Sequence, residues 1–155
     1  MSTNTNINTN INFEEALSHC RWKAKLKNLI PEINIRIYKG RSFEYIFQAI
    51  YHKCKKIKGL GLLTTYDITA SICKQHNIPI DRVYIIGTGP KRAIELLGLE
   101  AKKQWINKIL VNYVEIQAVI KAFENKKFDI DGEMKFTKNG DLVESFLCKW
   151  QKTIC

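Results

Sequence analysis

A short glycine turn between two helical patterns most restricts how this chain can fold. Gly59 and Gly61 flank a single apolar residue, Leu60. Downstream, Ile68 and Ile72 share one face of a predicted helix that ends near residue 77. Upstream, apolar residues recur at helical spacing: Phe43, Ile46, Phe47, Ile50, Cys54 and Ile57. Because glycine permits a tight turn, Leu60 is predicted to fill the junction between the two helices.

The same turn has the features of an anion site. The first amides of a helix have no partner within it, and the helix dipole is positive there, so they suit a phosphate oxygen. Four lysines lead into the turn: Lys53, Lys55, Lys56 and Lys58. Cations also stabilise the C-terminal end of a helix, which is the competing explanation for them.

This pattern resembles the helix-hairpin-helix motif, whose hairpin grips the DNA backbone without reading base sequence. The resemblance covers about residues 42–76. It implies a monovalent cation at the hairpin carbonyls, Na⁺ or K⁺, and no other cofactor. Leu62 and Leu63 depart from the motif, since a basic residue often follows its second glycine. The implied nucleic-acid contacts are Lys55, Lys56, Lys58, Gly59, Leu60, Gly61 and Thr64.

A second Gly-x-Gly follows at residues 87–89, and it is similar to the second half of a tandem pair of such motifs. It adds Gly87, Thr88, Gly89, Lys91 and Arg92 to the implied nucleic-acid contacts. A strand-turn-helix is the alternative, because residues 83–86 are β-branched and aromatic. More loosely, residues 58–67, 83–84 and 87–88 are similar to a group of bacterial proteins to which no activity can be attached.

The fold class predicted from these patterns is mainly α. Residues 1–11 form an Asn/Thr tail that is predicted to be disordered, and residues 12–155 a single helical domain with hairpins near 58–61 and 87–90. An apolar stripe from Ile106 to Phe123 predicts a helix over residues 100–123. Alternation over residues 33–37 suggests a short strand, and Asp131-Gly132 predicts a β-hairpin near the C-terminus.

Charge favours a polyanionic partner. The formal net charge is +10, and residues 21–58 alone hold 11 Lys and Arg against 2 acidic residues. The five cysteines are scattered and none is in a CxxC pair, which predicts reduced thiols, no metal site and a cytoplasmic location. No apolar run approaches the ~20 residues of a membrane span, so a membrane partner is not expected.

The predicted function is therefore non-sequence-specific DNA binding through the phosphate backbone, in an accessory role in DNA metabolism. An enzyme is less favoured. The enzymatic alternative is a glycosylase-like repair protein that uses Asp81, which follows Gly59 at about the spacing of the helix-hairpin-helix glycosylases. No lysine nucleophile stands at the matching position, which is Leu63. The second alternative is a protein-interaction module that uses Leu62, Leu63 and the 106–123 stripe.

Overall fold

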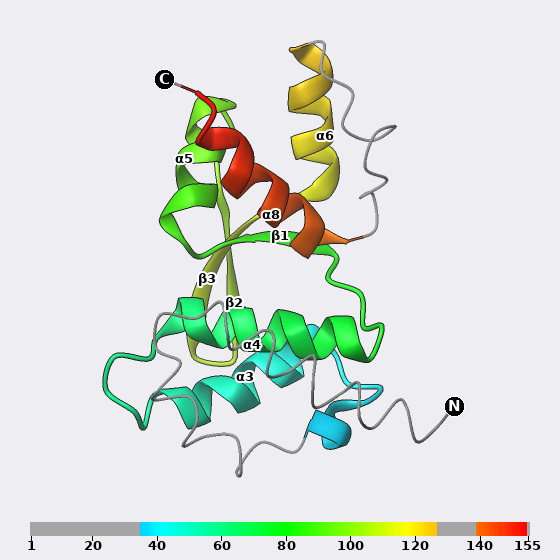
Figure 1. Cartoon of the computed structure of the whole chain (residues 1–155), viewed down its shortest axis with the longest axis vertical. Helices are drawn as coiled ribbons and strands as arrows, with labels where there is room; N and C mark the ends of the chain where they lie inside the picture. Colours follow the sequence, from blue (N-terminus) through cyan, green and yellow to red (C-terminus); the bar gives the residue numbers. More distant parts are fainter. Residues whose placement is uncertain (1–34, 127–138, 155) are drawn as a thin grey trace. The chain divides into compact units, whose positions relative to one another are not determined.

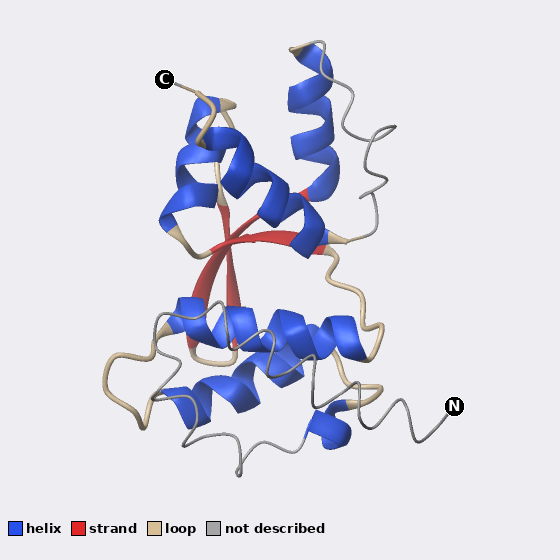
Figure 2. Cartoon of the chain, in the orientation of Figure 1, coloured by secondary structure: helices blue, strands red, loops and turns tan. Residues whose placement is uncertain are grey.

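The computed structural model describes residues 35–126 and 139–154, and statements about structure refer to these ranges. The chain divides into two compact units, with the boundary between Pro79 and Ile80, whereas the sequence was interpreted as one domain over residues 12–155. Five α-helices, one 3-10 helix and a three-stranded sheet occur in the described ranges (Figures 1 and 2). The mainly α fold class predicted from the sequence is therefore wrong, because the described residues mix helices with an antiparallel sheet.

The first unit contains a 3-10 helix, η2 (Ile35–Tyr38), and two α-helices, α3 (Phe43–Cys54) and α4 (Leu62–Gln75). The α-helices pack against each other, and the ring centroids of Phe43 and Tyr66 lie 6.1 Å apart across the contact. Five residues at helical spacing in α3 are buried, as the sequence predicted: Phe43, Ile46, Phe47, Ile50 and Cys54. The apolar face of α3 therefore forms much of this unit's core.

Local hydrogen bonds set the ends of these helices. The Ser42 side chain caps α3 by accepting a 3.1 Å bond from the Tyr45 amide. Helix α4 ends at Asn77, which has a φ of +55°, and the Ile78 amide donates back to the Cys73 carbonyl over 2.8 Å. The His76 ring nitrogen lies 2.7 Å from the Ile35 carbonyl oxygen and so joins the end of α4 to η2.

The strand suggested over residues 33–37 is not present in the described part of that segment. Residues from Ile35 onward form a 3-10 turn, in which Ile35 and Tyr38 point into the core three positions apart. Alternation of apolar and polar residues over so few positions fits this turn as well as a strand. The predicted tail at residues 1–11 and the predicted hairpin around Asp131-Gly132 lie outside the described residues.

The second unit combines a sheet with three helices. Its strands are β1 (Arg82–Ile85), β2 (Lys102–Ile106) and β3 (Ile109–Glu115), arranged antiparallel in the order β1-β3-β2. Its helices are α5 (Thr88–Leu96), α6 (Ile116–Asn125) and α8 (Gly140–Gln151). Gly98 follows the end of α5, and its positive φ and the 3.0 Å bond from its amide to the Glu95 carbonyl close the helix.

The helix predicted over residues 100–123 is wrong, because a β-hairpin and the separate helix α6 occupy this region. A two-residue turn of Asn107 and Lys108 joins β2 to β3, and Asn107 has a φ of +56°. Asparagine tolerates this left-handed conformation, which such tight hairpin turns require. The apolar positions 106, 109 and 113 fit both a helical stripe and one face of two strands, so spacing alone could not separate the two structures.

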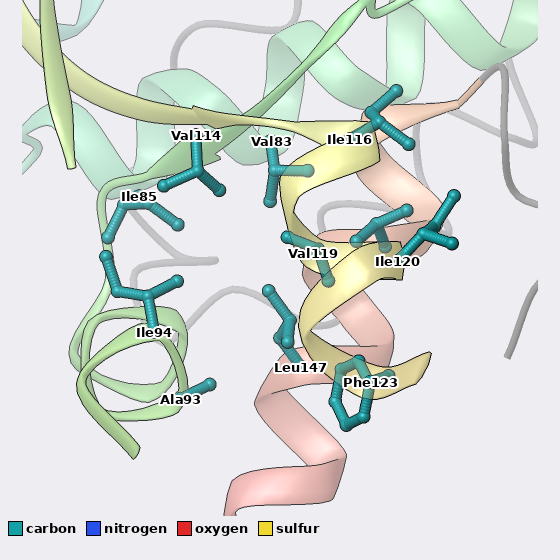
Figure 3. Packing of buried hydrophobic residues seen from close by; sticks show 11 residues of the cluster. Val83, Ile85, Ala93, Ile94, Val114, Ile116, Val119, Ile120, Phe123 and Leu147 are labelled. Atoms are coloured by element: carbon teal, nitrogen blue, oxygen red, sulfur yellow. The ribbon is translucent and has the colours of Figure 1, made fainter. Parts of the chain in front are cut away.

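The core of this unit lies between one face of the sheet and the three helices. Figure 3 shows apolar side chains from the strands and from all three helices meeting there. Val83 and Val114 are direct cross-strand partners on the covered face. Full burial of one such side chain contributes about 1.5–3 kcal/mol. The buried cluster is Val83, Ile85, Ala93, Ile94, Val114, Ile116, Val119, Ile120, Phe123, Val143 and Leu147.

Helix α8 approaches the sheet closely at Gly140. The Gly140 amide donates a 2.7 Å hydrogen bond to the Ile80 carbonyl, and a Cβ at this position would overlap the Arg82 carbonyl oxygen. Since that obstacle is backbone, no side-chain movement relieves the clash. Only glycine therefore allows α8 to begin against β1.

Replacing Gly140 with Ala should lower the free energy of unfolding by at least about 1–3 kcal/mol, the usual cost of overpacking. Urea denaturation checks this value. Ser145→Ala is the matched control, because Ser145 is exposed on the same helix. Equal stability of the two variants would contradict the proposed close approach.

Candidate nucleic-acid interface

The connection between α3 and α4 holds half of the nucleic-acid contacts that the sequence implied. Lys55 caps α3, and its amide donates to the Tyr51 carbonyl over 2.9 Å. Two further backbone bonds fold the connection back on itself, from Ile57 to Cys54 over 2.9 Å and from Leu60 to Ile57 over 3.2 Å. The connection is therefore two consecutive backbone turns with defined hydrogen bonds.

Leu60 fills the junction, as the sequence predicted. Its side chain is 6% exposed, whereas Gly59 and Gly61 on either side are exposed. Gly59 has a φ of +91°, a conformation that costs little only for glycine. With this backbone conformation at Gly59, the Leu60 side chain points into the core and the chain continues directly into α4.

The start of α4 leaves helix amides without an internal partner. Gly61 is the N-cap, has no side chain to accept a hydrogen bond from these amides, and no acidic residue lies in the first turn. A Cβ built on Gly61 would meet no atom within 4 Å, so the space beside it is open. Among the described residues, the first turn of α4 therefore supplies no carboxylate of its own to the positive end of the helix dipole.

The predicted contact residues in this segment differ in accessibility. Lys55, Lys56 and Lys58 are exposed, so their ammonium groups can reach a phosphate. Thr64 is only 5% exposed, and its hydroxyl therefore lies in the interior and does not face a ligand. Leu60 is also inside, so these two predicted contact residues act by shaping the connection.

The cation implied by the resemblance remains a prediction. The Gly61 carbonyl accepts from both the amide and the hydroxyl of Thr65, over 3.1 Å and 2.9 Å. A carbonyl oxygen has two lone pairs, so this one is already fully used. Within the described ranges, no group of three or more His, Cys, Asp or Glu side chains could hold a metal ion.

The second Gly-x-Gly is a strand-turn-helix, which excludes the tandem hairpin. Strand β1 ends at Ile85, Gly87 caps α5, and Thr88 and Gly89 are the first residues of that helix. A Cβ on Gly89 would lie 2.7 Å from the Cys148 Sγ, so this glycine is explained by the packing of α5 on α8. Thr88 and Lys91 are exposed at the start of α5.

Arg92 has a structural role in this unit. Its guanidinium donates to the Gln151 backbone carbonyl, to the Gln151 side-chain oxygen over 2.7 Å and to the Ile154 carbonyl over 3.2 Å. A cation at these carbonyls satisfies acceptors at the C-terminal end of α8 and complements its dipole. The predicted phosphate contact of Arg92 would compete with these bonds.

Asp81 is the residue considered for catalysis, and it belongs to the second unit. Asp81 is exposed just before β1 in the second unit, while Gly59, from which its spacing was counted, belongs to the first unit. His52 is exposed on α3, and His76 contacts η2. Cys54, Cys73 and Cys148, the cysteines of the described ranges, are not in disulfide bonds. Burial raises the pKa of Tyr38, and the neighbouring Tyr45 raises it further. Tyr38 lies outside the α3–α4 connection.

Comparisons with protein-family models, with curated proteins and with solved structures gave no match to this chain. The interpretation of the site therefore rests on its own residues. None of the helices in the described ranges has the length and apolar character needed to cross a membrane.

Leu60→Ala should lower the free energy of unfolding by about 2–5 kcal/mol, because it removes a buried side chain and leaves a cavity. Leu63→Ala is the matched control, since Leu63 is 47% exposed three residues away. Urea denaturation of both variants measures the difference. Similar losses would show that Leu60 is not the residue that fills the junction.

Arg92→Ala should destabilise the protein by about 1 kcal/mol, because it leaves acceptors at the end of α8 without their donor. Arg92→Lys should restore little, since an ammonium cannot reproduce the planar fork of donors. The neighbouring exposed Lys91, changed to Ala, is the control in thermal and urea unfolding. An Arg92→Ala variant as stable as Lys91→Ala would contradict the role assigned to Arg92.

Proposed function

We propose that the α3–α4 connection binds DNA through its phosphate backbone without reading base sequence, and that the protein acts as an accessory factor rather than a catalyst. One observation carries this proposal. Three exposed lysines lie within a single tight connection that ends at an uncapped helix N-terminus, while the connection's own leucine is buried. Such a surface offers positive charge and amide donors but little apolar area.

Binding of this kind gains free energy mainly from counterion release. Each phosphate neutralised by a lysine frees condensed cations from the DNA, so affinity falls as salt rises. The amides at the start of α4 would hold one phosphate by hydrogen bonds, which fixes the register of the helix on the backbone. Backbone contacts carry no base information, so sequence preference is not expected.

The alternative explanations fare less well against the structure. Cation stabilisation of the α3 dipole accounts for Lys53 and Lys55, but Lys58 lies beyond the helix end. The protein-interaction alternative loses the 106–123 stripe, because its residues are divided between two strands and α6 and most of them are buried. Of the residues in that alternative, Leu63 and Leu110 remain exposed.

The double variant Lys55→Ala/Lys56→Ala should weaken duplex DNA binding and flatten its salt dependence. Each lost phosphate contact lowers the slope of log affinity against log salt by about 0.9, so a change of about 2 is expected. Fluorescence anisotropy with a labelled duplex over a salt series measures both quantities.

The matched control is Lys149→Ala/Lys152→Ala, which removes the same charge from exposed positions in and after α8. This control should change affinity only slightly and leave the slope near that of the wild type. Equal effects of the two double variants would assign binding to net charge and contradict a site at the connection. Absence of salt-sensitive binding by the wild type would overturn the proposal as a whole.

A further inference from the structure

The β2–β3 hairpin presents an uncovered aromatic side chain, Trp105, which is 66% exposed. Within residues 35–126 and 139–154, β2 pairs only with β3 and is therefore an edge strand. Directly opposite residues of an antiparallel pair lie on the same face, and the partner of Trp105 is Leu110, which is 39% exposed. The two side chains therefore form one apolar patch near the tip of the hairpin.

This patch lies on the same face of the sheet that the helices cover near β1. Val83 pairs with Val114 on the covered face, and Ile85 pairs with Asn112 two positions along β3 on that face. Asn112 pairs in turn with Lys103 on β2, and both are exposed. Lys103 and Trp105 thus stand next to each other on the same side of the edge strand, where the helices no longer cover the sheet.

The opposite face of the hairpin carries a partly buried group of hydrogen-bonded side chains. Arg82 and Tyr84 both donate to the Gln104 side-chain oxygen, over 2.9 Å and 3.1 Å. The Arg82 guanidinium also lies 4.1 Å from the centroid of the Tyr113 ring. These contacts fix Gln104, and because neighbouring residues of a strand point to opposite faces, they hold Lys103 and Trp105 outward.

The charge around the tryptophan is of one sign. Residues 101–114 contain three lysines, Lys102, Lys103 and Lys108, and no acidic residue. All three lysines are exposed. Lysine is depleted in the cores of protein–protein interfaces, whereas an aromatic side chain among cations is the arrangement that binds unpaired nucleotides.

We infer that the β2–β3 hairpin binds an unpaired DNA strand, with one base stacked on Trp105 and an adjacent phosphate held by Lys103 on the same strand face. The inference rests on the proposed function for DNA as the ligand, but it uses residues of the other unit. Paired bases present no free face to Trp105, so this contact adds affinity only for single-stranded DNA.

The test compares Trp105→Ala with the wild type on two labelled probes, an oligothymidine of about 20 nucleotides and a duplex of the same length. Trp105→Ala should weaken single-strand binding roughly 5- to 100-fold, the range of one lost base stack, and leave duplex binding unchanged. Trp105→Phe should retain part of the affinity. Leu142→Ala, a 46% exposed apolar residue on α8, is the matched control and should bind as the wild type does.

Intrinsic fluorescence supplies a second readout. Stacking should quench the tryptophan emission when oligothymidine is added to the wild type, and most of this quenching should disappear in Trp105→Phe. Single-strand affinity that is unchanged in Trp105→Ala, or wild-type binding without quenching, would overturn the inference. A wild-type dimer in sedimentation that Trp105→Ala dissociates would also overturn it, by assigning the surface to a second copy.

The outcomes separate this inference from the proposed function. Suppose that duplex binding depends on Lys55 and Lys56 but single-strand binding does not depend on Trp105. That result would overturn only the inference that a base stacks on Trp105. Single-strand binding that depends on Trp105, together with duplex binding indifferent to those two lysines, would overturn only the proposed role of the α3–α4 connection.

Discussion

Burial of Leu60 is the interaction on which the first unit depends. Leu60 is the buried residue of the short connection between α3 and α4, so the chain must turn inward at Leu60 and outward on both sides of it. The left-handed conformation at Gly59 makes that turn feasible. As a result the lysines before the leucine and the helix amides after it face solvent within a few residues of each other. The packing of Leu60 therefore determines where the lysines and the helix amides are exposed.

In the second unit, strand register has the corresponding role. Pairing of Val83 with Val114 and of Trp105 with Leu110 places all four residues on one face of the sheet. Helices α5, α6 and α8 cover the part near β1 and leave the hairpin tip uncovered (Figures 1 and 3). The same alternation that builds a hydrophobic core therefore also presents a tryptophan and a lysine to solvent. A one-residue slip in the pairing register would turn the core residues and the exposed residues of a strand to opposite faces.

Local patterns in the sequence predicted local structure well. Helical spacing predicted α3, and the glycine flanks predicted the burial of Leu60. The β-branched run at residues 83–86 favoured the strand that the structure contains. The helix over residues 100–123 was wrong because its apolar spacing also fits two strands, and Asn107-Lys108 was not recognised as a two-residue turn. Recognition of that turn would have placed Lys103 and Trp105 on one strand face. The Arg92 contacts could not be predicted, since their partners lie about 60 residues further along the chain.

The ties between α5 and α8 have a consequence for synthesis. Gly89 contacts Cys148, and Arg92 bonds to Gln151, which lies 59 positions later. The second unit therefore cannot complete its core until α8 has emerged from the ribosome. The helices of the first unit contact each other over a much shorter stretch, so that unit can form while translation continues. During this interval the apolar faces of β1 and α5 are available to chaperones, and slowing of translation before residue 140 would prolong their exposure.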